Sequence, residues 1–166
     1  KAFNLMVSMR EITMLQESGM RSVVLQNEDS SVKIVLVECI EAGKTSKIQN
    51  YINNNGGPGI HHAAFQTTNV IAATESLTKK GVKFLPTQEI YYENLDTAIR
   101  HKFHGQLESM KRYNILIDVD QDGYLLQVFT RPLNARGTYF LELIQRERSK
   151  GFGSNNIKHL YETLDK

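Results

Sequence analysis

Thr138-Tyr-Phe-Leu-Glu-Leu-Ile-Gln145 has the pattern of a strand with two apolar faces and one charge. Side chains of a strand alternate between its faces, so Glu142 shares a face with Phe140 and Ile144. A buried carboxylate is costly unless it is paired, and this stretch contains no cation. Two arrangements would satisfy the charge: a buried ion pair with an arginine or lysine from elsewhere, or a metal ion shared with an imidazole.

The imidazole that could share a metal ion with Glu142 is His62, in Gly56-Gly-Pro-Gly-Ile-His-His-Ala-Ala-Phe65. Strand alternation puts His62 on one face and its neighbour His61 on the other. Taken alone, a strand histidine beside small residues is more often a hydrogen-bonded core residue than a ligand. The combination with Glu142 is what favours a metal site, and the glycines before His62 leave room for one.

Gln127 is a second polar side chain in an apolar strand, between Leu125 and Phe129 on the same face. If it is buried, its amide needs hydrogen-bond partners. A loop carbonyl and a bound ligand satisfy this requirement equally well, so the residues leave both alternatives open.

Composition narrows the class of protein. The chain has 166 residues and 40% hydrophobic content, which is enough for a core, and 20 Lys and Arg balance 18 Asp and Glu. We therefore expect no nucleic-acid partner. No apolar run reaches the ~18 residues of a membrane span, so no membrane association is expected either. The single cysteine, Cys39, excludes an internal disulfide framework and is compatible with an intracellular, cytoplasmic location.

Apolar periodicity and turn signals predict an alternation of short strands and helices. Strands are expected at 3–8, 11–16, 22–26, 32–40, 60–67, 82–85, 115–119, 123–130 and 139–146, the first two of which can form one bent strand. Helices are expected at 46–53, at 69–80 between the N-cap Asn69 and the stop Gly81, at 91–103 and at 155–164. This order indicates an α+β protein whose sheet curls around a cavity, preceded by the end of a similar unit.

Four ordered motifs resemble the catalytic half of the 4-hydroxyphenylpyruvate dioxygenase family, which includes hydroxymandelate synthase. They are Gly57-Pro-Gly-Ile-His-His-Ala-Ala-Phe65, Gly123-Tyr-Leu-Leu-Gln-Val-Phe-Thr130, Phe140-Leu-Glu-Leu-Ile-Gln-Arg146 and Gly151-Phe-Gly153. The resemblance spans essentially the whole chain. It implies the vicinal oxygen chelate fold, also found in glyoxalase and bleomycin-resistance proteins, in which paired βαβββ modules form an open barrel.

The same resemblance implies how the chain is organised. Residues 1–166 would form a single catalytic-type domain with a truncated first module. Residues 1–55 would be the remainder of that module and a linking helix, 56–146 the second module, and 147–166 a C-terminal lid helix. We therefore expect the chain to be a fragment of a longer protein.

The resemblance also implies a metal site. Two histidines and one glutamate hold Fe(II) in this family, and by motif match His62 is similar to the second histidine and Glu142 to the glutamate. The first histidine would lie upstream of Lys1. The implied partners are an aromatic 2-oxo acid such as 4-hydroxyphenylpyruvate, together with dioxygen, and a homo-oligomer stays open. The implied reaction is an oxidative decarboxylation and hydroxylation that belongs to tyrosine catabolism.

By the same matching, several side chains are expected to contact the substrate. Gln127 corresponds to an orienting, catalytic glutamine, and Ser22 to a pocket serine. The remaining expected substrate-binding positions line the cavity, and they are Phe129, Phe140, Phe152 and Ile157.

Four positions depart from the dioxygenase pattern. Val37 replaces a pocket asparagine, while His61 and Lys47 replace two glutamines. Ile157 replaces a phenylalanine that packs on the substrate ring, and an aliphatic residue there is typical of hydroxymandelate synthases. Without that aromatic wall the substrate can tilt and offer its benzylic carbon, so homogentisate and 4-hydroxymandelate are both candidate products.

Two functions follow from these observations. The first is an Fe(II)-dependent, 4-hydroxyphenylpyruvate dioxygenase-like oxygenase that is incomplete in this chain. The alternative is a non-catalytic ligand-binding or scaffold module of the same fold, since the polar pocket has lost several members.

Overall fold

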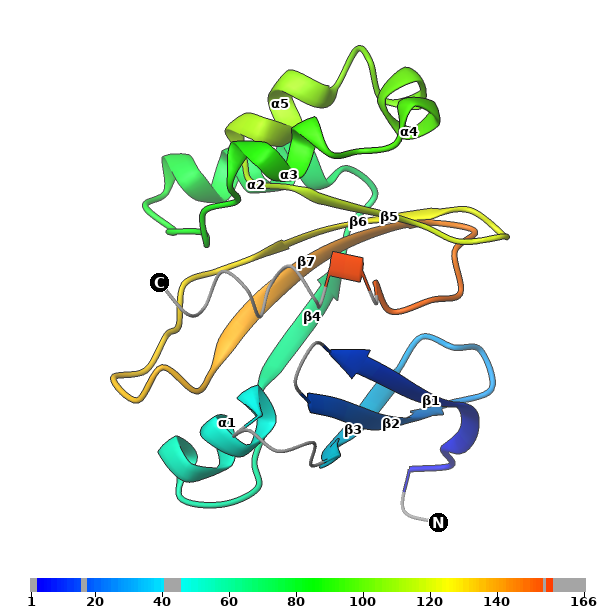
Figure 1. The fold of residues 1–166 in the computed structure, drawn as a ribbon, viewed down its shortest axis with the longest axis vertical. Coiled ribbons are helices and arrows are strands. Elements are labelled where there is room, and N and C mark those ends of the chain that lie inside the picture. Colours follow the sequence, from blue (N-terminus) through cyan, green and yellow to red (C-terminus); the bar gives the residue numbers. More distant parts are fainter. Residues whose placement is uncertain (1–2, 16–17, 41–45, 154, 157–166) are drawn as a thin grey trace. The chain divides into compact units, whose positions relative to one another are not determined.

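The chain folds as two compact units, residues 1–59 and residues 60–166. The computed structural model describes residues 3–15, 18–40, 46–153 and 155–156. Each unit carries its own sheet (Figure 1). No helix in these described ranges has the length and apolar character needed to cross a membrane.

The first unit is built on a three-stranded antiparallel sheet with the order β1-β2-β3. Its elements are β1 (Met6–Leu15), β2 (Ser18–Gln26), β3 (Lys33–Ile40) and the helix α1 (Lys47–Asn55). The register of β1 shifts between Val7 and Met9, so the two segments expected at 3–8 and 11–16 are one bent strand. The helix α1 begins at Ser46, whose side chain accepts a hydrogen bond from the Gln49 N–H group.

The second unit contains a four-stranded mixed sheet with the order β4-β7-β6-β5. β4 runs parallel to β7, and the other neighbours are antiparallel. Its strands are β4 (His62–Gln66), β5 (Leu116–Val119), β6 (Tyr124–Phe129) and β7 (Phe140–Glu147). Its helices are α2 (Val70–Lys79), α3 (Glu89–Glu93), α4 (Thr97–Lys102) and α5 (Leu107–Arg112).

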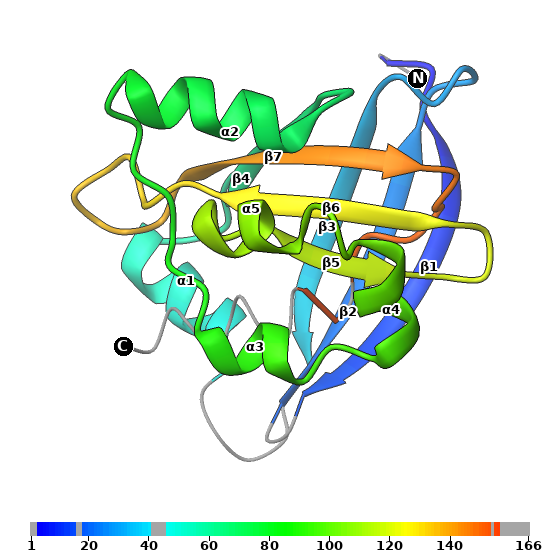
Figure 2. The same ribbon diagram turned by 90° about the horizontal axis from the view of Figure 1, so that it is seen from above.

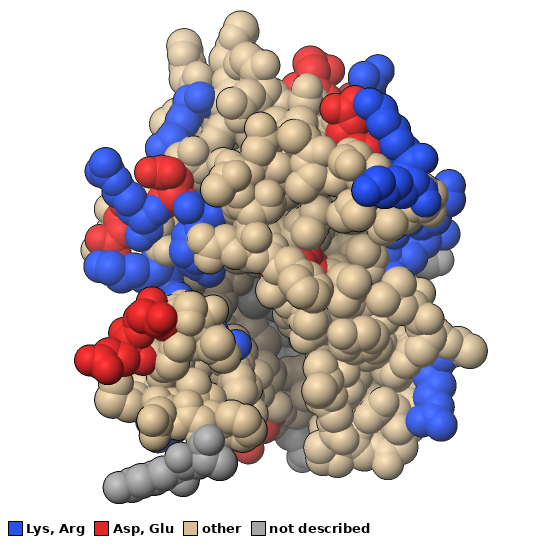
Figure 3. All heavy atoms as spheres, turned by 180° about the vertical axis from the view of Figure 1, so that it is seen from behind, with Lys and Arg blue, Asp and Glu red and all other residues tan. Residues whose placement is uncertain are grey.

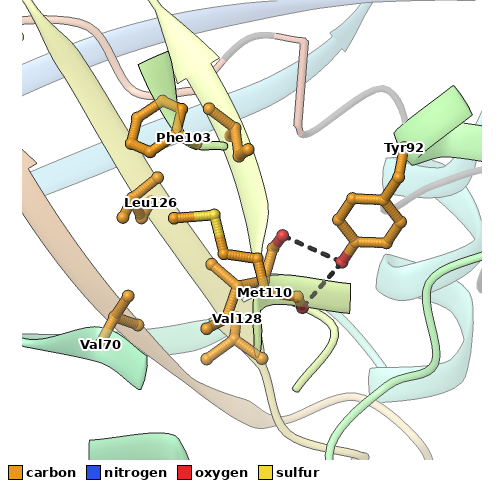
Figure 4. Packing of buried hydrophobic residues seen from close by; sticks show 8 residues of the cluster. Val70, Tyr92, Phe103, Met110, Leu126 and Val128 are labelled. Atoms are coloured by element: carbon orange, nitrogen blue, oxygen red, sulfur yellow. Dashed lines mark hydrogen bonds between the residues drawn. The ribbon is translucent and has the colours of Figure 1, made fainter. Parts of the chain in front are cut away.

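Helices cover one face of this second sheet, as Figure 2 shows for α2 to α5. Leu126 and Val128 of β6 point to that face and pack in a fully buried cluster with Val70 and Met110 (Figure 4). Side chains alternate along β6, so Gln127 points to the opposite face. The larger buried cluster therefore lies on the helical side, and the polar residues of interest lie on the other, together with a smaller cluster that contains Phe129 and Phe140.

Most local predictions are confirmed, and the region between β4 and β5 holds the exceptions. The predicted helix at 91–103 is wrong as one element: the chain forms α3 and α4 instead, because Asp96 caps a new helix by accepting from the Ala98 N–H group. The strand expected at 82–85 is reduced to one bridge between Phe84 and Thr130. The helix α5 was not expected at all.

The mixed α+β class is confirmed, since strands and helices occupy the order described above. The pairing of two modules as an open barrel and the module boundaries within 1–166 stay predictions. The last helix, expected at 155–164, lies almost wholly outside the described residues. The surface drawn in Figure 3 shows Lys and Arg side chains close to Asp and Glu, in keeping with the formal net charge of +2.

Candidate metal centre

His62 and Glu142 come together because β4 and β7 are parallel neighbours. Ala64 is the register partner of Glu142, and His62 lies two residues before Ala64 on the same face. The Nε2 atom of His62 lies 3.5 Å from Oε2 of Glu142. The Glu142 side chain is only 5% exposed, whereas that of His62 is 38% exposed. One ligand of the expected pair is thus fully enclosed, and the other is open on one side.

Burial shifts the pKa values of both members of this pair in the direction that favours their uncharged forms. It raises the pKa of Glu142 from 4.5 to about 7, although the hydrogen bond from Gln127 and the charge of Arg146 oppose the rise. Burial also lowers the pKa of His62. Both groups are therefore disfavoured in their charged forms, and a bound cation would reverse that preference at Glu142.

The spacing of the two ligand atoms fits a metal ion. Ligand atoms about 2 Å from one ion lie roughly 3 to 4 Å from each other, and the Nε2 to Oε2 distance is 3.5 Å. Neutral imidazole and carboxylate are the donors expected for a non-haem Fe(II) site. Within the described part of the chain, no group of three or more His, Cys, Asp or Glu side chains is placed to hold a metal ion.

His61 does not point away from His62, contrary to the expectation from strand alternation. β4 begins at His62, so His61 precedes the strand and alternation does not apply to it. Its Nδ1 atom lies 3.2 Å from Nδ1 of His62. Burial and the neighbouring His62 together lower the pKa of His61 to about 4. A neutral His61 can thus form a hydrogen bond with Nδ1 of His62, which orients the His62 ring so that its Nε2 atom faces Glu142.

Gln127 binds the carboxylate directly. Its Nε2 donates to Oε1 of Glu142 at 2.7 Å and lies 3.4 Å from the carbonyl oxygen of Phe152. Its Oε1 accepts from Nδ2 of Asn156 at 2.8 Å. Gly153 lies against this amide, where a Cβ atom would collide with the Gln127 side chain. The segment after β7 therefore closes over Gln127 through backbone and Asn156.

Two charged side chains hold that segment in place. The Asp120 carboxylate accepts from the Ser149 hydroxyl at 2.6 Å and from the N–H groups of Lys150 and Gly151. These bonds, led by the one from Ser149, hold the pKa of Asp120 well below its usual range. From the other side, Nη1 of Arg146 donates to the carbonyl oxygens of Ser149 and Gly151.

Aromatic rings form a wall beside the pair. The His62 ring stacks on Phe140 at 5.0 Å with an interplanar angle of 7°. Phe129 meets Phe140 edge to face at 5.9 Å. Phe129 and Glu142 are register partners, so these rings share the ligand face. Phe129 and Phe140, which were expected to line the cavity, thus lie next to His62 and Glu142. The carbonyl oxygen of Phe152 contacts Gln127 beside them.

The remaining expected positions belong to the first unit or lie outside the described residues. Ser22 and Val37 belong to the first unit, where they are register partners in β2 and β3. Ser22 is 6% exposed and Val37 is 44% exposed. Lys47 begins α1 in the same unit, and burial lowers its pKa. Ile157 lies outside the described residues, so its role as a substrate contact stays a prediction.

Sequence reasoning missed three contributors. Arg146 lies on the same face of β7 as Glu142, one alternation beyond the stretch quoted first, and continued alternation would have found it. Asp120 lies in the turn between β5 and β6, where it accepts from the N–H groups of Asp122 and Gly123, and this local role gives no signal of its contacts with the segment after β7. Asn156 had no local signal, since its partner is 29 residues away.

Comparison with known proteins identifies the family of the chain. A family model described as Glyoxalase/Bleomycin resistance protein/Dioxygenase superfamily matches residues 2–99. The chain belongs to this superfamily. The fold class expected from the sequence is thereby confirmed at the level of the superfamily.

Individual proteins similar to this chain have names more specific than that of the superfamily. The chain is 41% identical over 152 residues to a 4-hydroxyphenylpyruvate dioxygenase from Danio rerio, and 38% identical over 151 residues to one from Sus scrofa. These alignments cover 90% and 89% of this chain but 38% of each relative. A mutant of 4-hydroxymandelate synthase from Streptomyces coelicolor has a similar structure, with a TM-score of 0.83 and 34% identity over 98% of this chain and 47% of that one. The resemblance to 4-hydroxyphenylpyruvate dioxygenases is confirmed, and the chain spans about two fifths of the length of these curated relatives.

Proposed function

We propose that this chain is part of an Fe(II)-dependent oxygenase that decarboxylates and hydroxylates an aromatic 2-oxo acid with dioxygen. The observation that carries the proposal is the buried Glu142 carboxylate beside His62, in a chain similar to 4-hydroxyphenylpyruvate dioxygenases. A structural carboxylate would be expected to have a full complement of cationic partners. This one keeps a raised pKa of about 7, which favours a site built for a metal ion.

The choice of Fe(II) rests on the donor set. Two imidazoles and one carboxylate on one face of an ion are typical of non-haem Fe(II) oxygenases. His62 and Glu142 would supply two of these donors. The third donor, a histidine, is proposed to lie in a part of the same protein outside these 166 residues, since the chain matches only 38% of the length of the relative from Danio rerio.

Fe(II), when bound, would supply coordination sites for the 2-oxo acid and for dioxygen and would donate electrons to the reduction of dioxygen, which is the oxidant. The residues of this chain do the positioning. Gln127 holds Oε1 of Glu142 and leaves Oε2 toward His62. Phe129 and Phe140 give the site an apolar wall that suits an aromatic ring and excludes water.

The product is either homogentisate or 4-hydroxymandelate. Structural similarity to a 4-hydroxymandelate synthase supports 4-hydroxymandelate, and sequence similarity to the 4-hydroxyphenylpyruvate dioxygenases supports homogentisate. Ile157 and Val37 favour 4-hydroxymandelate, because neither offers the aromatic or amide contact of the dioxygenase pattern. An intracellular location is proposed as well, on the free thiol of Cys39.

The test is to purify the complete protein that contains these residues, load it with Fe(II) and supply 4-hydroxyphenylpyruvate. Oxygen uptake with release of carbon dioxide is expected, and mass spectrometry of the product distinguishes homogentisate from 4-hydroxymandelate. Glu142→Gln should abolish stoichiometric iron binding. Glu147→Gln, on the same strand with a 58% exposed side chain, is the matched control and should bind iron normally.

Failure of these assays would identify the second candidate function. Iron binding without oxygen uptake would indicate another reaction at the same centre. Absence of both would favour a non-catalytic ligand-binding module, for which the departures at Val37, Lys47 and His61 are the supporting observation.

A further inference from the structure

A hydrogen-bonded relay runs from the candidate metal pair to a tyrosine of α3. Gln127 donates to Glu142, and Asn156 donates to Gln127, as described above. The hydroxyl of Tyr91 in turn donates to Oδ1 of Asn156 at 3.2 Å. Four residues from β7, β6, the C-terminal segment and α3 are thus connected through side-chain polar atoms alone.

The chemistry of the relay fixes the direction of each bond. A carboxylate that holds a metal ion is ionised and only accepts, so Gln127 has to present its NH₂ group to Glu142 when the metal is bound. Oε1 of Gln127 then faces Asn156, which has to present its own NH₂ group. Oδ1 of Asn156 is left facing Tyr91, whose hydroxyl can donate. An amide turned by 180° has the same shape with opposite polarity, so these bonds and not packing decide its orientation.

The far end of the relay is held firmly. The Tyr91 hydroxyl accepts from the Ile117 N–H group at 2.8 Å, and its single proton is shared between Oδ1 of Asn156 at 3.2 Å and the Ile117 carbonyl oxygen at 3.0 Å. Its ring meets Tyr92 edge to face at 5.0 Å. Asn156 is fully buried, so water does not replace a lost partner there. Burial raises the pKa of Tyr91 to about 12, which keeps its proton in place at neutral pH.

We propose that Tyr91 is a positioning residue for the metal centre, acting through Asn156 and Gln127 to keep the Gln127 NH₂ group on Oε1 of Glu142. This inference rests on the proposed function for its metal. Its consequence is that Oε2 of Glu142 stays free and directed toward His62. Tyr91 itself touches neither metal nor substrate in this scheme.

The adjacent tyrosine provides a matched control. The Tyr92 hydroxyl lies 3.1 Å from the Met110 carbonyl oxygen and 3.0 Å from that of Ile115, in the cluster on the helical face (Figure 4). Tyr92→Phe therefore removes a buried hydroxyl from the same short helix without touching the relay. Tyr91→Phe removes the hydroxyl that ends the relay.

Two measurements are made on the complete protein, neither of which requires turnover. Anaerobic titration with Fe(II) gives the affinity, which should fall by roughly 10- to 100-fold in Tyr91→Phe and stay within about twofold of the parent in Tyr92→Phe. The ¹H–¹⁵N signals of the Gln127 side-chain amide, recorded without metal, should shift in Tyr91→Phe only. Loss of turnover in the parent with these results intact would refute the proposed oxygenase and leave the relay standing.

Two results would overturn the inference: an unchanged affinity with unchanged Gln127 signals in Tyr91→Phe, or equal changes in both tyrosine variants. If Tyr91→Phe does not fold, Asn156→Asp takes its place. Aspartate keeps the shape and the acceptor for Tyr91 but loses the donor to Gln127, so the same fall in affinity is expected. Normal affinity in Asn156→Asp would equally refute the relay.

Discussion

Replacing Glu142 with glutamine should stabilise the metal-free chain at alkaline pH. The carboxyl group has a pKa of about 7 in the folded protein and an ordinary value of 4.5. As pH rises between these values, the unfolded state releases its proton first, so unfolding becomes more favourable. Glutamine keeps the acceptor for Gln127 and carries no charge, so it removes this pH dependence.

The pKa difference gives the magnitude. From pH ~5 to pH ~8.5 the stability of Glu142→Gln relative to the parent should rise by roughly 2 to 3 kcal/mol. Urea unfolding followed by circular dichroism in a chelating buffer measures the difference. Hydrogen exchange at the amides of β6 and β7 assigns it to the second unit.

In the complete protein, which would include the third ligand, added Fe(II) should make the parent more stable than the variant, because the metal binds the folded parent and not the variant. The matched control is Glu147→Gln, which removes an exposed carboxylate from the same strand. A Glu142→Gln difference that does not change with pH would refute the assignment of Glu142 as a buried carboxylate without a full counterion.

Four other substitutions test the fold and the closure over the site. Asn69→Ala removes the cap of α2 and should lower the free energy of unfolding by about 1 kcal/mol. Met110→Ala in the buried cluster should lower it by roughly 2 to 5 kcal/mol. Equal losses in the two variants, measured by urea unfolding, would contradict the packing described. Gly153→Ala and Gly137→Ala both place alanine at positive φ, but only the first meets Gln127, so iron titration should show weaker binding in Gly153→Ala alone.

The parts of the fold that could be predicted are those with local signals. The Asn69 cap and the Gly81 stop lie within or next to the helix that they delimit, and both are confirmed. The helix expected at 91–103 was wrong because its apolar spacing continues through Asp96, where a capping bond starts a new helix. Periodicity reports which residues are apolar, and it does not report where the backbone turns between them.

The site divides in the same way. His62 and Glu142 were predicted to lie close together because a metal ion shared with an imidazole would satisfy the charge of a buried carboxylate. The structure places Nε2 of His62 3.5 Å from Oε2 of Glu142. His61 was placed on the wrong side because its position before the strand depends on where pairing with β7 begins. Asn156 reaches Gln127 only through the path of the chain after β7, which no local pattern encodes.

The five hydrogen bonds that Asp120 accepts have a consequence for the order of folding. Two close its own turn, at Asp122 and Gly123, and three hold Ser149, Lys150 and Gly151. The turn bonds span two or three residues and form early, while the others wait until β7 has paired and its exit has reached the turn. Opening of the segment that covers Gln127 would require its bonds to both Asp120 and Arg146 to break, whereas the pairing of the sheet could stay intact.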